Sequence, residues 1–134
     1  MPSTYTLNNG IELISTGEQS GTWGDTTNTN LSLLDTALDG QVTVTLPSAG
    51  TSGSPNTLAI TDGAASGGRN PMVTFVDGGD WGGTAYVQLS PNDPEKLIYV
   101  RNILAGSRSI VVAQGTEHPR EDDRVPGVAL RRFR

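Results

Sequence analysis

Short runs of alternating apolar and polar residues, each closed by turn-forming residues, recur along the chain and limit what it can fold into. In residues 41–46, for example, Val42, Val44 and Leu46 alternate with Gln and Thr, and Pro47 follows. Such alternation is typical of a half-buried strand, and proline lacks the N–H that a continuing strand would need. Six such runs occur, at residues 41–46, 57–61, 72–76, 85–89, 96–101 and 109–113. Strands spaced in this way, with Gly, Pro, Asn and Asp between them, predict a mainly β fold, an antiparallel sandwich or jelly-roll-like pair of sheets.

The hydrophobic period changes once, in the block that follows Trp23, where leucines recur at spacings of three and four. This spacing is typical of one face of a helix, and Asp25 and Thr26 are suited to cap its start. Gly40 stands where a glycine commonly ends a helix. The pattern predicts one short N-terminal helix over about residues 26–39 that packs on the core, after a loop anchored by the tryptophan. The residues that we expect to be structural or assembly anchors are Trp23, Leu31, Leu34 and Leu38.

The composition limits the classes of partner and compartment. The chain has 134 residues, enough for one small domain, and 34% of them are hydrophobic, so we expect a modest core. A net charge of −5 gives no general attraction to nucleic acid or to an anionic membrane. Because the chain has no cysteine, disulfides and thiolate metal sites are excluded. No apolar run approaches the ~20 residues of a membrane span, and residues 1–10 lack the pattern of a signal peptide, so we expect a soluble, intracellular product.

No set of residues stands out as an active site. The single histidine, His118, has no second histidine or cysteine to share a zinc ion and no nucleophile in a recognisable motif. The acidic residues are scattered over turns, where such side chains commonly bond their own backbone. The Gly-rich segments 63–68 and 78–83 do not open a helix, as a phosphate-binding loop would. The sequence therefore predicts no catalytic residues, no cofactor and no metal site.

Trp81 is the strongest candidate for a binding contact. It lies between Gly79 and Gly82 in a predicted loop. An exposed tryptophan in a loop can stack on a sugar ring or fill a pocket of a partner, and it can equally fold back onto the edge of a sheet. Both interpretations stay open at this point: Trp81 as a contact for a glycan or a protein partner, and Trp81 as a packing residue.

Two Arg-Asn pairs lie beside predicted strands, at residues 69–70 and 101–102. Their side chains could bond loop carbonyls at the ends of the sheets, or form ion pairs between subunits. We expect the first role, because buried loop carbonyls need donors.

The two ends of the chain differ from its centre. Residues 117–134 hold five of the nine basic residues together with four acidic ones. We predict a single β-rich domain over residues 1–116, which begins with an N-terminal arm and the helix, and a charged, solvated tail over residues 117–134. A cationic tail that touches an acidic neighbouring subunit is the alternative.

The block GEQSGTWGDTTNTNLSLLDTAL and the strand after it resemble a segment of virion structural proteins of tailed bacteriophages, in particular tail-fibre and similar appendage proteins. The resemblance extends downstream to the strand entry at residues 68–71 and to the run 96–102, and covers residues 5–115. The charged surroundings of the Val125-Pro126 turn depart from the family's pattern. The residues that carry the motif are Gly17, Gly21, Thr22, Trp23, Gly24, Thr27, Asn28 and Asn30.

The resemblance implies a non-enzymatic structural protein of the phage particle, made in the host cytoplasm and located in the virion. Such a protein docks on other virion proteins and assembles with itself, with a homotrimer favoured. One alternative is a decoration or fibre protein of the capsid or head. Another is a host-attachment module that binds surface polysaccharide through Trp81. Neither nucleic acid nor membrane insertion is expected for any of these functions.

Overall fold

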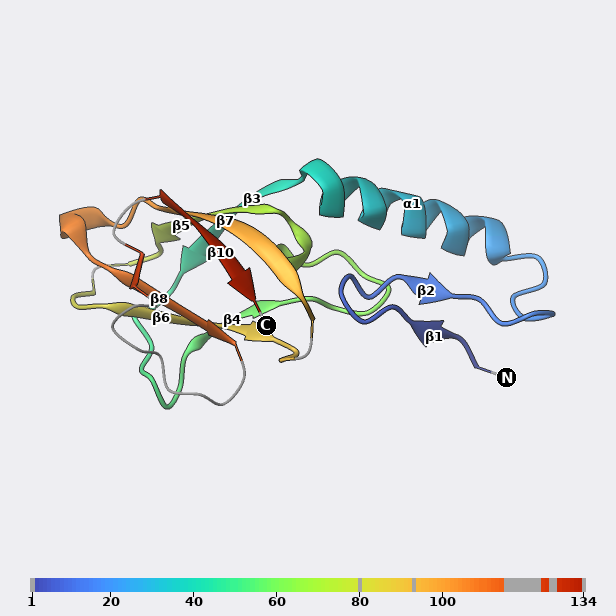
Figure 1. The fold of residues 1–134 in the computed structure, drawn as a ribbon, viewed down its shortest axis with the longest axis horizontal. Coiled ribbons are helices and arrows are strands. Elements are labelled where there is room, and N and C mark those ends of the chain that lie inside the picture. Colours follow the sequence, from blue (N-terminus) through green and yellow to red (C-terminus); the bar gives the residue numbers. More distant parts are fainter. Residues whose placement is uncertain (1, 80, 93, 115–123, 126–127, 134) are drawn as a thin grey trace.

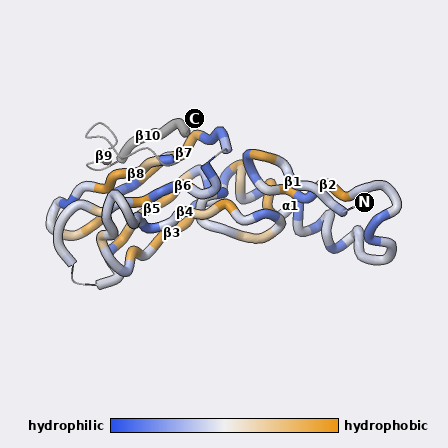
Figure 2. The backbone as a smooth tube through the Cα atoms, turned by 90° about the horizontal axis from the view of Figure 1, so that it is seen from below, coloured by the Kyte–Doolittle hydropathy of each residue, from blue (hydrophilic) through white to orange (hydrophobic). Residues whose placement is uncertain are grey.

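An N-terminal arm projects from a body made of two β-sheets (Figure 1). The computed structural model describes residues 2–79, 81–92, 94–114, 124–125 and 128–133. The arm consists of an antiparallel hairpin and the helix α1, which lie side by side in both views (Figures 1 and 2). Its elements are β1 (Thr4–Tyr5), β2 (Glu12–Leu13) and α1 (Trp23–Asp39).

Within the described part of the chain, the body has two four-stranded sheets. One has the strand order β10-β7-β5-β3, and the other β4-β6-β8-β9. Short 3₁₀ turns, η1 (Gly67–Arg69) and η2 (Ala105–Ser107), precede β5 and β8. The strands are β3 (Gln41–Leu46), β4 (Asn56–Ala59), β5 (Met72–Asp77), β6 (Ala85–Ser90), β7 (Lys96–Asn102), β8 (Ile110–Gln114), β9 (Arg124–Val125) and β10 (Val128–Phe133).

The chain alternates between the two sheets from β3 to β8, so strands that follow one another in sequence are not paired. In one sheet β3, β5 and β7 are parallel neighbours, and in the other β4, β6 and β8 are parallel neighbours. Each step along a sheet thus passes through the opposite sheet, as in the winding of a short β-helix. The antiparallel strand pairs described in these two sheets involve the last two strands along the chain: β9 pairs with β8, and β10 pairs with β7.

The structure confirms a mainly β chain with one α-helix in its described residues, but the prediction of antiparallel, jelly-roll-like sheets is wrong for β3 to β8. Turn-forming residues show that a strand ends, and they do not show where the next strand pairs. Hairpin loops need only about two to five residues. The segments 47–55 and 60–71 are longer and cross from one sheet to the other.

The inward faces of the two sheets form one hydrophobic core. Phe75 on β5 and Ile98 on β7 are fully buried, and Val87 and Leu89 on β6 belong to the same cluster. Buried and more exposed residues alternate along these strands, as the period of two in the sequence predicts. On the edge strand β3, Leu46 is buried and the two valines before it are half-buried, in agreement with a half-buried strand.

The helix starts earlier than predicted and ends where expected. It begins at Trp23, so Asp25 and Thr26 lie inside the first turns and do not cap them. The amide of Trp23 instead donates to the carbonyl of Gln19 at 2.9 Å. A main-chain carbonyl of the preceding turn thus accepts from the first helical amide, where a capping side chain was expected.

Gly40 follows the last helical residue, but its role differs from that of a left-handed glycine cap. Its backbone is extended, with φ −65° and ψ 147°. A Cβ at this position would lie 2.4 Å from the carbonyl oxygen of Thr36 and 2.5 Å from Oδ1 of Asn70. Glycine is favoured here because a Cβ would meet both the last turn of the helix and Asn70 of the body, not because the backbone takes a positive φ.

Two strands of the body come from the segment predicted to be a charged tail. The backbone of β10 pairs with β7 from Val128 to Phe133, and β9 pairs with β8 over two residues. Backbone pairing to the edge of a sheet does not require an apolar alternation, which explains why the sequence pattern did not reveal these strands. His118 lies outside the described residues.

Candidate functional site

The helix α1 presents three rows of side chains at helical spacing. The row that faces the hairpin and the body is buried or half-buried and consists of Thr26, Asn30, Leu33 and Ala37. A polar row is exposed and consists of Asp25, Asn28, Ser32, Asp35 and Asp39. The third, which we call the apolar row, consists of Trp23, Thr27, Leu31, Leu34 and Leu38.

The large side chains of the apolar row lie in solvent. The exposed fractions are 61% for Trp23, 58% for Leu31, 41% for Leu34 and 74% for Leu38. The prediction that this row packs on the core is therefore wrong, and the buried leucine of the helix is Leu33. Rows one residue apart are turned by about 100° around a helix, so a hairpin on one side covers only one of them. The role of the apolar row as an assembly anchor stays a prediction.

Side-chain hydrogen bonds to the hairpin set the rotation of the helix. Nδ2 of Asn30 donates to the carbonyl of Glu12 at 2.8 Å, and its Oδ1 accepts from the amide of Glu12 at 3.1 Å. The side chain of Gln19 accepts from the hydroxyl of Thr26 and donates to the carboxylate of Glu12. These bonds hold the inward row against β2 and thereby keep the apolar row outside.

A buried arginine joins the arm to the body, and we call its contacts the Arg69 clamp. The Arg69 side chain is 0% exposed. Its Nε donates to the carbonyl of Asn9 in the hairpin turn at 2.8 Å, its Nη2 to the carbonyl of Thr61 at 2.6 Å, and its Nη1 to the carbonyl of Ala64. Burial lowers the pKa of the guanidinium, and the charge of Asp62 opposes this shift. The predicted role of Arg69 as a donor to loop carbonyls is confirmed.

The two asparagines of the Arg-Asn pairs also bond loop carbonyls. Nδ2 of Asn70 donates to the carbonyl of Gly67 at 3.1 Å, and Nδ2 of Asn102 donates to that of Arg108 at 2.7 Å. Arg101, in contrast, is exposed. The structural interpretation thus holds for three of the four side chains.

Lys96 adds a second cation to the clamp. Its Nζ donates to the carbonyl of Arg69 at 2.7 Å and to Oδ1 of Asn9 at 3.3 Å. Burial, and then the nearby charge of Arg69, lower the pKa of Lys96 to about 8. No motif in the sequence singled out Lys96 as part of a site. The signal that could have found it is its place at the start of a strand whose alternate residues are buried.

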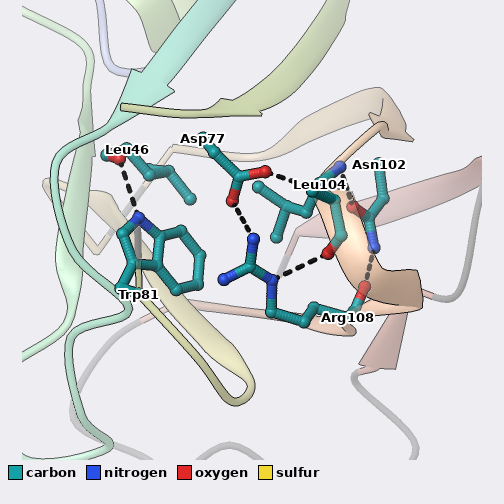
Figure 3. A network of polar contacts seen from close by, with 7 residues as sticks. Leu46, Asp77, Trp81, Asn102, Leu104 and Arg108 are labelled. Atoms are coloured by element: carbon teal, nitrogen blue, oxygen red, sulfur yellow. Dashed lines mark hydrogen bonds and ion pairs between the residues drawn. The ribbon is translucent and has the colours of Figure 1, made fainter. Parts of the chain in front are cut away.

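Trp81 folds back onto the body beside Leu46, at the end of β3 that is farther from α1, and lies in a polar network (Figure 3). Its Nε1 donates to the carbonyl of Leu46 at 3.3 Å. The guanidinium carbon of Arg108 lies 4.3 Å from the centroid of the Trp81 ring, and its Nη2 forms a 2.7 Å ion pair with Asp77. The second carboxylate oxygen of Asp77 accepts from the amide of Ala105 at 2.6 Å.

This geometry shows Trp81 as a packing residue. The ring is half-buried against the core, its N–H is bonded, and a cation of the same chain stacks on it. A role for Trp81 in contacting a glycan or a partner stays a prediction, since part of the ring remains accessible.

Among the residues that the structure describes, no three His, Cys, Asp or Glu side chains gather where they could hold a metal ion. The described helix is also not long and apolar enough to cross a membrane. Comparison of the chain with protein-family models, with curated proteins and with solved structures gave no match. The candidate functional surface is the apolar row of α1, because its large side chains lie in solvent.

Proposed function

We propose that this protein is a non-enzymatic structural component of a bacteriophage particle, a tail-fibre or similar appendage protein that docks on the particle and assembles with itself. The observation that carries the proposal is the apolar row, held outward on an ordered arm with four large side chains in solvent. Contiguous apolar surface of this kind commonly marks a contact with another protein. The resemblance of the motif at Trp23 to phage appendage proteins is the reason to propose a phage particle as the place of this contact.

The polar groups of the described residues support a structural role. Arg69 and Lys96 bond main-chain carbonyls, and Arg108 and Asp77 bond each other. These groups, which could have supplied charge to a reaction, hold loops and the arm in place. The architecture is thus a small packed body that carries a fixed arm, which suits a building block.

The proposal is tested on particles of a phage whose genome encodes this chain. Virions purified on a density gradient are analysed by mass spectrometry, and an antibody raised against the chain is used for gold labelling. We expect the chain to sediment with the particles and the label to lie on the tail or its appendages. Label on the head would favour the alternative of a capsid decoration protein. Absence of the chain from purified particles would contradict both.

A further inference from the structure

We propose that the apolar row is a self-association seam, on which a second copy of this chain packs its own α1. The inference rests on the proposed function, in which the protein assembles with itself, and it assigns that assembly to one surface. The partner is thus a helix of the same sequence, and the contact is made by Thr27, Leu31, Leu34 and Leu38, with Trp23 at one end.

The spacing of the row suits an identical helix. From Thr27 the positions follow at intervals of four, three and four residues, through Leu31 and Leu34 to Leu38. An alternation of three and four lets the side chains of one helix fit between those of a second helix that carries the same repeat. Since the bonds of Asn30 to the hairpin fix the rotation of α1, the apolar row lies to one side of the covered row, in solvent, in every copy.

The charges of the helix are arranged so that such a contact buries none of them. Asp25, Asp35 and Asp39 all lie in the polar row, and the helix has no lysine or arginine. Contact along the apolar row therefore leaves the three carboxylates in solvent, where their hydration is kept. A basic partner would instead be attracted to the polar row and would leave the leucines exposed.

The exposed area is close to what a specific contact between two copies requires. If the tryptophan offers about 250 Å² and each leucine somewhat less, about 150 Å², the exposed parts of Trp23 and the three leucines amount to roughly 400 Å² per chain. Two copies would then bury roughly 800–1,000 Å² in total, at the lower limit of specific interfaces. A third copy on the same seam would use the flanks of each row and bury more.

Cysteine cross-linking tests the seam directly, because the wild-type chain has no cysteine. Leu31→Cys places a thiol at the centre of the apolar row, and Ser32→Cys places one on the polar row as the matched control. Under mild oxidation of the full chain we expect the Leu31→Cys variant to form a covalent dimer at least roughly tenfold faster than the Ser32→Cys variant. Equal rates for the two variants would overturn the proposal.

Sedimentation velocity gives an independent test. We expect the wild-type chain to associate at micromolar concentration. Leu34→Glu, which puts a charge in the apolar row, should weaken this association by at least roughly tenfold. Ser32→Glu, on the polar row, is the control and should associate like the wild type. Circular dichroism checks that each variant keeps its fold. If Leu34→Glu does not fold, Leu38→Glu replaces it, because Leu38 is the most exposed residue of the row. A wild-type chain that stays monomeric at about 100 μM would overturn the seam. This result would not contradict a place in the virion, since a monomer can still dock on a particle. The virion labelling experiment tests that part of the proposed function separately.

Discussion

The guanidinium of Arg69 donates a hydrogen bond of 2.8 Å to the main-chain carbonyl of Asn9, sixty residues earlier in the chain. This bond connects the turn of the N-terminal hairpin to the body. The amide of Gly63 reinforces it by donating to the carbonyl of Gly10 at 2.7 Å. The direction in which the arm points, and with it the position of the apolar row, depends on this junction.

Replacing the buried arginine should loosen the arm and destabilise the body. Arg69→Met removes the donors of three carbonyls, so we expect the free energy of unfolding to fall by about 3 kcal/mol or more. Urea denaturation measures the change, and limited proteolysis should show faster cleavage in the arm. Arg101→Met, at an exposed arginine, is the matched control and should change stability by less than about 0.5 kcal/mol. Equal effects of the two substitutions would contradict the role of the clamp.

The stability of the protein should rise with pH between about 8 and 10.5. The pKa of Lys96 is lowered from 10.5 to about 8 in the folded state, so within this window the unfolded state binds more protons. The free-energy cost of burying the charged amine in the folded state is fully present below pH 8 and is lost as the pH rises toward 10.5. Because the side chain is only partly buried, we expect a gain of about 1–2 kcal/mol.

Lys96→Met provides the control for this pH dependence. Lys96 is the only lysine of the chain, so the substitution removes the side-chain amine without changing another one. Urea denaturation at pH 8 and pH 10 should show the rise in the wild type and a flatter profile in the variant. Identical profiles would show that Lys96 does not cause it.

Two glycine-to-alanine substitutions in and beside α1 should have opposite effects. At Gly40 a Cβ would meet the carbonyl oxygen of Thr36 at 2.4 Å, so we expect Gly40→Ala to cost about 1–3 kcal/mol. At Gly24, inside the helix, a Cβ would meet nothing within 4 Å beyond the adjacent residues and backbone of the helix itself, so Gly24→Ala should stabilise the helix by up to about 1 kcal/mol. Thermal unfolding followed by circular dichroism compares the two. A gain in stability from Gly40→Ala would contradict the close approach of Thr36 to Gly40.

The two tryptophans should differ in their effect on stability. Trp81→Ala removes a ring that packs on the core and bonds Leu46, and we expect a loss of about 2–3 kcal/mol. Trp23→Ala removes an exposed ring and should change the stability of the monomer by less than about 0.5 kcal/mol. Denaturation at a low protein concentration separates these effects from self-association. A neutral Trp81→Ala would show that its ring is free for another role.

A glycan array tests that other role. Trp81→Phe keeps an aromatic ring on the core and loses only the bond to Leu46, at a cost of about 1 kcal/mol. Because the ring is packed and stacked by Arg108, we expect the wild type and this variant to give no specific glycan signal. A signal in the wild type that weakens in Trp81→Phe would support the polysaccharide-binding alternative.

Sequence periodicity identified the elements well and their partners poorly. Val42, Val44 and Leu46 alternate as a half-buried strand in both the sequence and the structure. The sheets were expected to be antiparallel, and this strand pairs in parallel with β5 instead. The alternation reports which side of a strand is apolar, and it carries no information on which strand lies beside it.

The prediction of the helix was limited in the same way, because a sequence pattern does not show what packs against a given face. Spacings of three and four correctly predict a helical apolar row, but not whether the protein's own core covers it. Asn30 and Leu33 form a neighbouring row that is less apolar as a set, and this row faces the hairpin. Leu31 and Leu34 are left in solvent because hydrogen bonds to Glu12 set the rotation of the helix.

The sequence by itself determined the class of the chain, its local elements and the end of its helix, because these depend on residues that are close together along the backbone. The tertiary structure decided the parallel winding of the strands, the Arg69 clamp, the packing of Trp81 and the exposure of the apolar row. Each of these depends on contacts between distant segments, such as Asn9 with Arg69 and Leu46 with Trp81. A local pattern does not specify such contacts, since several arrangements can bury the same apolar residues.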